Sequence, residues 1–121
     1  CGDHEYDTKF NQSFYMVKGN NDLFLDLPSE INLTVEGIKI HIEHGHYLGR
    51  LDPVSTGFKM MEKEGYNLFL YGHSHIPAKD ERDGLFMINP GSTSEPRKTK
   101  KGTYCIIQID GSKIDVKFNY I

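Results

Sequence analysis

Two histidines separated by one residue follow the apolar run from Tyr66 to Tyr71, in the segment Gly72-His73-Ser74-His75. Two imidazoles spaced in this way cannot share one helix face, but in an extended or tightly turned segment their ring nitrogens can converge. Such a pair could bind one metal ion or two adjacent ions. The pair alone also fits two loop histidines that do no chemistry, because this spacing is common.

The chain contains four further polar clusters that include glycine, and three of them follow strand-like runs. They are Cys1-Gly2-Asp3, Gly19-Asn20-Asn21-Asp22, His44-Gly45-His46 and Asn89-Pro90-Gly91-Ser92. Active sites of α/β sheets gather at the carboxyl ends of strands. We therefore expect these loops to meet the two histidines at one edge of a sheet.

The side chains in these clusters indicate which metal could bind. Carboxylate, amide oxygen and several imidazoles suit Mn²⁺, Fe²⁺ or Zn²⁺ better than Ca²⁺, which takes oxygen ligands alone. A structural zinc site normally uses cysteines at short spacing, and Cys1 and Cys105 cannot supply one. The pattern favours a catalytic metal site over a structural one.

The five clusters, in this order, resemble those of the calcineurin-like metallophosphoesterases, and most closely the YfcE-type phosphodiesterases of bacteria and archaea. The resemblance runs from Cys1 to about Asn119. It implies an α/β fold in which two mixed β-sheets form a sandwich flanked by helices. It also implies hydrolysis of a small phosphoester by a hydroxide that bridges two divalent metal ions, with Mn²⁺ the first expectation and Fe, Ni or Zn the alternatives.

The resemblance also assigns metal-binding roles to particular residues. Asp3 would bridge the two ions, and His75 would bind the first ion. The second ion would take, besides Asp3, the side chains of Asn20, His44 and His73.

The chain departs from the family at its first-metal motif. Relatives supply an aspartate and a histidine from an Asp-x-His motif on a first strand, and this sequence opens at Cys1 inside the second motif. We expect the domain to be incomplete at its N-terminus, the second metal site to bind and the first to be weak. We also expect the chain to be less stable than a complete homologue or to self-associate as a homo-oligomer.

Two residues are candidates for catalysis and one for substrate binding. Asn21 stands where many relatives have a histidine that protonates the leaving oxygen, and asparagine can donate a hydrogen bond but not a proton. His46 is the nearest replacement acid, although it could equally be a residue that hydrogen-bonds its loop. Arg97 could hold phosphate oxygens with its guanidinium, whereas it and the lysines after it could also form a solvated loop.

Composition limits the remaining function classes. The 121 residues, 37% of them hydrophobic, are enough for one globular domain over residues 1–121, and no apolar run approaches the length of a membrane span. A formal charge of −3 argues against broad nucleic-acid binding. Two cysteines far apart in sequence fit a reducing cytoplasm.

The expected elements are mostly strands around one helix. Strands are predicted at Phe14–Val17, Ile31–Val35, Ile38–Ile42, Leu68–Tyr71, Leu85–Ile88, Thr103–Ile109 and Ile114–Asn119. Glu36-Gly37 and Asp110-Gly111 predict hairpin turns. One helix is predicted at Pro53–Glu64, with Asp52 as its N-cap and Gly65 at its end.

A second function class stays open beside the enzyme. The metallophosphoesterase-like subunit of the retromer sorting complex has a similar fold and serves as a protein-binding scaffold. A scaffold has little reason to keep both metal-binding loops, Cys1-Gly2-Asp3 and Gly19-Asn20-Asn21-Asp22. The sequence therefore favours a metal-dependent phosphoesterase.

Overall fold

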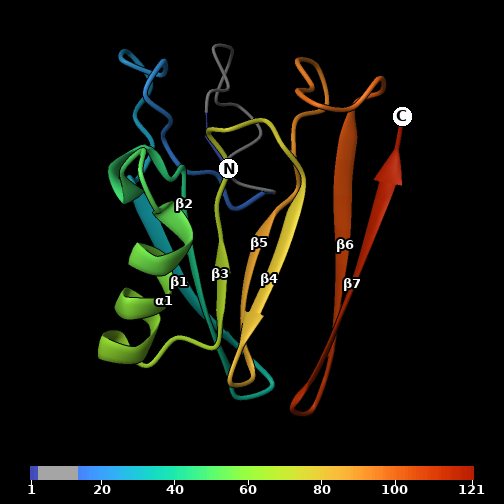
Figure 1. The fold of residues 1–121 in the computed structure, drawn as a ribbon. Coiled ribbons are helices and arrows are strands. Elements are labelled where there is room, and N and C mark those ends of the chain that lie inside the picture. Colours follow the sequence, from blue (N-terminus) through green and yellow to red (C-terminus); the bar gives the residue numbers. More distant parts are fainter. Residues whose placement is uncertain (3–13) are drawn as a thin grey trace.

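The computed structural model describes residues 1–2 and 14–121 and contains two sheets and one long helix (Figure 1). The elements follow one another as β1 (Glu30–Val35), β2 (Ile38–Glu43), the 3₁₀ helix η1 (His46–Leu48), α1 (Pro53–Glu64), β3 (Leu68–Leu70), β4 (Ala78–Arg82), β5 (Leu85–Asn89), β6 (Thr103–Asp110) and β7 (Lys113–Tyr120). No helix in these ranges is long and apolar enough to span a membrane.

The larger sheet is mixed and has five strands in the order β1-β2-β3-β5-β4. Strands β2, β3 and β5 are parallel, and each edge strand pairs antiparallel with its neighbour. Because parallel strands end at the same edge of a sheet, the loops that follow β2, β3 and β5 lie together. This arrangement is the one expected for the histidine clusters.

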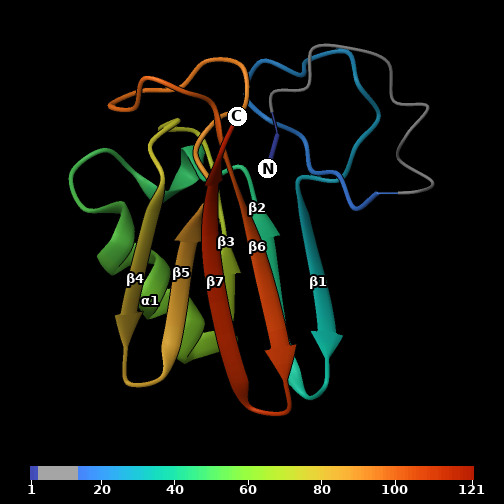
Figure 2. The same ribbon diagram turned by 90° about the vertical axis from the view of Figure 1, so that its right-hand side faces the viewer.

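The second sheet is the antiparallel hairpin of β6 and β7, which lies over one face of the larger sheet (Figure 2). One apolar core fills the space between the two sheets, with Ile40, Leu68 and Ile88 from the larger sheet and Ile114 from the hairpin. A second core lies on the opposite face, where α1 covers the sheet (Figure 1). The expected architecture of two sheets and a flanking helix is confirmed.

Helix α1 has the bounds that its sequence predicts. Asp52 caps the N-terminus by accepting a hydrogen bond from the backbone N–H of Ser55 at 3.0 Å. Gly65 ends the helix in the left-handed conformation, φ 80°, with its N–H bonded to the Met61 carbonyl at 2.9 Å. The apolar face of the helix places Phe58 and Met61 in the second core.

Two predictions about strands were wrong or incomplete. Phe14–Val17 is not a strand: Val17 is buried in the first core, but the chain here is held by loop contacts such as the bond from Lys18 N–H to the Pro28 carbonyl. Strand β4 was missed, although Asp83-Gly84 joins it to β5 through two residues of positive φ. The hairpin at Asp110-Gly111 is confirmed.

Candidate metal centre

The loops after β2 and β3 are held against each other by the backbone. The Gly72 N–H donates to the His44 carbonyl at 2.8 Å, and the Tyr71 N–H donates to the Ile88 carbonyl at 3.0 Å. These bonds place the two His-x-His segments side by side at the edge where the parallel strands end. The loop containing Asn20 reaches the same place from outside the sheet.

Three electron-pair donor atoms converge at this edge. Asn20 Oδ1 lies 2.8 Å from His44 Nε2 and 3.2 Å from His73 Nδ1. The two histidine nitrogens are themselves 3.2 Å apart. Asn20, His44 and His73 therefore form one cluster, as the sequence predicted for the second metal ion.

The ring of His44 is oriented by the start of the chain. Its Nδ1 lies 2.6 Å from the carbonyl oxygen of Cys1, an acceptor, so Nδ1 carries the hydrogen of this bond and Nε2 faces Asn20. A histidine that binds a metal usually donates its other ring N–H in this way, which fixes both tautomer and orientation. His44 is also buried, at 2% exposure, so its ring has little freedom.

Gly2 packs against this ring so closely that no side chain fits. A Cβ at Gly2 would lie 2.5 Å from His44 Nδ1 and 2.8 Å from the Gly19 Cα, and the residue has φ +89°. Glycine at this position thus serves the placement of His44. The Cys1-Gly2-Asp3 cluster contributes through its backbone, and Asp3 lies outside the described residues.

His75 shows the same orientation pattern at the other side of the loop. Its Nδ1 donates to the Glu95 carbonyl at 2.9 Å, which leaves Nε2 with the lone pair. Both His73 and His75 have positive φ, 66° and 60°. Non-glycine residues adopt this region at a cost in conformational energy, and they do so preferentially at functional sites.

Asn89 holds the histidine loop in this strained conformation. It is fully buried at the end of β5, and its amide nitrogen donates to the Gly72 carbonyl and to Ser74 Oγ, each at 2.9 Å. Its Oδ1 accepts from the Gly91 N–H at 2.9 Å. One side chain thus ties β5, the histidine loop and the next loop together.

The cluster opens into a cavity of about 710 Å³. Its lining consists of the histidine loops, the start of the chain and a hydroxyl-rich loop after β5: Cys1, Gly2, Asn21, His44, Gly72, His73, His75, Pro90, Gly91, Ser92, Thr93, Ser94, Glu95, Thr103 and Tyr104. A cavity of this size accommodates a small phosphoester.

The candidate catalytic residues lie at different distances from the cluster. Asn21 is exposed and lines the cavity. The ring of His46 is centred 5.4 Å from that of His44 and 6.2 Å from that of His73. Its Nδ1 is buried with no hydrogen-bond partner among the described residues, which is unusual for a polar atom and does not fit a role of bonding its own loop.

Arg97 contacts the histidine loop through its backbone. Its N–H donates to the His75 carbonyl at 3.0 Å, while the residue as a whole is exposed. Its side chain is not part of the described lining of the cavity.

The donor set fits a divalent cation. His44 Nε2 and Asn20 Oδ1 are 2.8 Å apart and both can coordinate a metal, so a divalent cation would replace the hydrogen bond between them with two coordinate bonds. Donor atoms around a tetrahedral ion with bonds near 2.1 Å are separated by about 3.4 Å. The three donor atoms of this cluster are 2.8 to 3.2 Å apart, so they need to move only slightly farther apart to surround such an ion.

A family model described as the calcineurin-like phosphoesterase superfamily domain matches residues 1–112. The chain belongs to this superfamily. A probable metallophosphoesterase of Bacillus subtilis, YsnB, is 33% identical over 120 residues, which are 98% of this chain and 71% of that protein. A probable metallophosphoesterase of Mycoplasma pneumoniae is 35% identical over 130 residues, 99% of this chain and 79% of that protein.

The solved structures agree with the fold. A protein of Streptococcus pneumoniae described as a predicted phosphoesterase superposes with a TM-score of 0.89 at 29% identity, over 98% of this chain and 70% of that one. Vps29 of Entamoeba histolytica complexed with zinc superposes with a TM-score of 0.73 at 19% identity, over 87% of this chain and 66% of that one. The second likeness concerns the fold alone.

The backbone carbonyls that orient the imidazoles could not be found from the sequence. Cys1 and Glu95 act through main-chain oxygens, which every residue type possesses. Asp22 is buried and accepts from the Gly19 N–H at 2.9 Å, so it shapes the turn that presents Asn20.

Proposed function

We propose that this chain is a metal-dependent phosphodiesterase or phosphatase that hydrolyses a small phosphoester in the cavity beside His44 and His73. The observation that carries the proposal is the convergence of Asn20 Oδ1, His44 Nε2 and His73 Nδ1 within 3.2 Å of one another. Membership of the calcineurin-like phosphoesterase superfamily supports the reaction class.

The proposed metal ligands are those of the converging cluster, with Asp3 added from the sequence. Asn20, His44 and His73 would hold one divalent cation, and His75 would contribute to a second. When bound, such a cation supplies Lewis-acid stabilisation of charge on the phosphoryl oxygens. Mn²⁺ is the proposed ion, because oxygen and imidazole ligands without thiolate suit it.

The other polar groups would bind the substrate and manage its protons. The Asn21 amide lines the cavity and would donate a hydrogen bond to a phosphoryl oxygen. Arg97 would hold a second phosphoryl oxygen with its guanidinium. Both contacts become stronger as negative charge develops on the phosphate.

His46 is the proposed proton donor to the leaving oxygen. Its ring is centred 5.4 Å from that of His44 and 6.2 Å from that of His73, although His46 is not among the residues that line the cavity. Because its Nδ1 is buried, the proton would be delivered from Nε2. Without a histidine at position 21, proton delivery depends on this more distant ring. We therefore expect activated diesters, whose leaving groups need little protonation, to be the best substrates.

The scaffold alternative rests on fold alone. Vps29 structures superpose well but share about a fifth of their residues with this chain. Vps29 of Entamoeba histolytica is itself complexed with zinc, so the three facing donor atoms do not by themselves separate the two hypotheses. The higher identity to probable metallophosphoesterases, 33% for YsnB of Bacillus subtilis, favours the enzyme.

The experiment is hydrolysis of bis(p-nitrophenyl) phosphate in the presence of Mn²⁺, compared between wild type and His73→Ala. We expect manganese-dependent release of p-nitrophenol from the wild type and at least a roughly 100-fold lower rate from the variant, the scale of one lost electrostatic group. An Asn119→Ala variant, altered on β7 at a half-buried position whose amide bonds the nearby Lys117 carbonyl, is the control. Equal rates in wild type and His73→Ala would contradict the proposal.

A further inference from the structure

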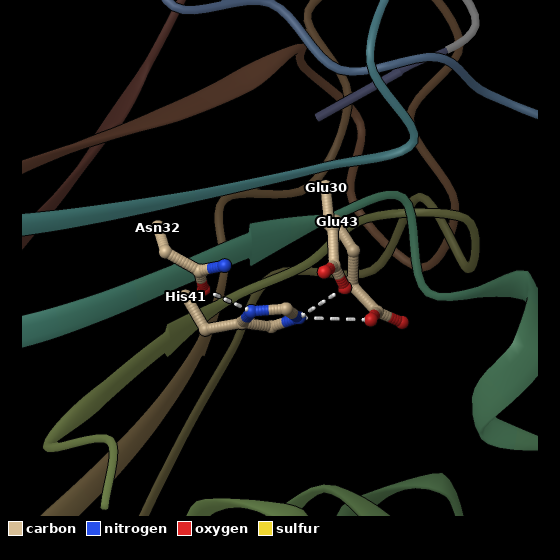
Figure 3. A network of polar contacts seen from close by, with 4 residues as sticks. All are labelled: Glu30, Asn32, His41 and Glu43. Atoms are coloured by element: carbon tan, nitrogen blue, oxygen red, sulfur yellow. Dashed lines mark hydrogen bonds and ion pairs between the residues drawn. The ribbon is translucent and has the colours of Figure 1, made fainter. Parts of the chain in front are cut away.

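A second cluster of metal-binding side chains lies on the β1–β2 hairpin, away from the three-donor cluster. It consists of Glu30 on β1 and of His41 and Glu43 on β2 (Figure 3). One donor atom from each residue lies within 4.8 Å of the others.

The strand register brings the two carboxylates directly opposite each other. Glu30 pairs with Glu43, and Asn32 pairs with His41, in the antiparallel ladder. Like charges at opposed positions of a strand pair destabilise it. A cation between Glu30 and Glu43 would therefore stabilise the hairpin.

His41 points its Nε2 at both carboxylates. The distances are 3.0 Å to Glu43 Oε2 and 3.8 Å to Glu30 Oε2 (Figure 3). The other ring nitrogen, Nδ1, lies 2.7 Å from Asn32 Oδ1, an acceptor, so Nδ1 carries the hydrogen. Nε2 hydrogen-bonds Glu43 Oε2 in the absence of a metal, and a metal ion that replaced the hydrogen at Nε2 would meet both carboxylates.

The imidazole is held rigidly in this orientation. It is 1% exposed, stacks on Tyr66 with ring centroids 4.7 Å apart and meets the edge of Phe69 at 4.7 Å. A ligand fixed by packing and by a hydrogen bond to its second nitrogen is characteristic of metal-binding histidines. Glu30, 54% exposed, leaves an entry path from solvent.

We propose that Glu30, His41 and Glu43 form a second, peripheral site for a divalent transition metal of the zinc type. One imidazole and two carboxylates form a three-ligand set that Zn²⁺ accepts, with water in the open position. The ion would join edge strand β1 to β2 immediately before His44, and so hold the strand that leads into the proposed active site.

The test is zinc content after loading with Zn²⁺ and desalting, measured on the full chain by elemental analysis. The variant Glu30→Gln/Glu43→Gln keeps the shape of both side chains but removes two ligands. The matched control, Glu62→Gln/Glu81→Gln, removes two exposed negative charges elsewhere. We expect the first variant to hold about one zinc equivalent fewer than both wild type and control.

The same comparison in a His73→Ala background separates this site from the proposed active site. Loss of one equivalent there, with the main cluster already disabled, supports an independent site. Hydrogen exchange gives a second readout: zinc should slow exchange of the β1 amides in wild type but not in Glu30→Gln/Glu43→Gln. Equal zinc content in the two glutamate variants, or no zinc dependence of β1 exchange, would overturn the proposal.

Discussion

His44 Nε2 and Asn20 Oδ1 face each other at 2.8 Å, while the other ring nitrogen of His44 lies 2.6 Å from the Cys1 carbonyl oxygen. Without a metal, a hydrogen at Nε2 bonds the Asn20 oxygen, and a cation that replaced this hydrogen would be held by both atoms. This relationship joins a loop near the start of the chain to the end of β2, and we propose that the two side chains bind a metal ion together.

Asn20→Ala removes the oxygen donor and should weaken Mn²⁺ binding by at least the roughly 10- to 100-fold that loss of an outer hydrogen bond to a ligand costs. Isothermal titration calorimetry measures the change. Asn67→Ala is a poor control, because Asn67 accepts from the Lys39 N–H. Asn119→Ala is better placed, since its amide only bonds the nearby Lys117 carbonyl, and it should bind manganese like wild type.

Gly2→Ala should displace the His44 ring, because the new Cβ would lie 2.5 Å from His44 Nδ1. Gly49→Ala is its matched control: Gly49 has φ +88°, as against +89° for Gly2, but nothing lies within 4 Å of its Cβ position. Both variants carry the same backbone strain, and only Gly2→Ala should lose manganese affinity. Equal affinities would show that close packing at Gly2 does not position the imidazole.

Asn89→Ala should destabilise the fold as well as the site. The side chain makes three hydrogen bonds in a fully buried position, and its loss leaves the Gly72 carbonyl and the Gly91 N–H without this partner. Unsatisfied buried polar groups cost about 1–3 kcal/mol each. Urea unfolding of Asn89→Ala should show a lower midpoint than wild type, with the same dependence of the unfolding free energy on urea concentration. An unchanged midpoint would show that the Asn89 hydrogen bonds do not stabilise the fold.

Burial, with a smaller contribution from Asp80, raises the pKa of Tyr71 to about 12. The unfolded pKa is near 10, so the folded state disfavours the tyrosinate, and the stability contribution is complete below pH 10 and lost as pH rises toward 12. Wild type should therefore lose up to about 2–3 kcal/mol more than Tyr71→Phe over this range. Chemical unfolding at several alkaline pH values, compared between the two proteins, measures that difference.

The sequence predicted those features that depend on local chemistry. Helix α1 has its expected bounds because Asp52 and Gly65 mark its ends by side-chain capping and by positive φ. The convergence of the histidine loops was predictable because His44 and His73 follow parallel neighbouring strands, whose ends meet at one edge. In both cases a few residues determine the outcome.

Features that depend on distant partners were not predictable. Strand β4 is the polar segment Ala78–Arg82, which has little intrinsic strand preference and forms by pairing with β5. Phe14–Val17 is apolar enough for a strand but lies in a loop, because burial of Val17 needs no ladder. The opposition of Glu30 and Glu43 likewise follows from hairpin register, which composition does not reveal.

The most direct test of the central claim is the manganese content of wild type and His73→Ala after loading and desalting, with circular dichroism to confirm that both are folded. We expect His73→Ala to hold about one equivalent of manganese less than wild type, because the three-donor cluster loses a ligand. Equal manganese content in two folded proteins would contradict the assignment of Asn20, His44 and His73 as a metal centre.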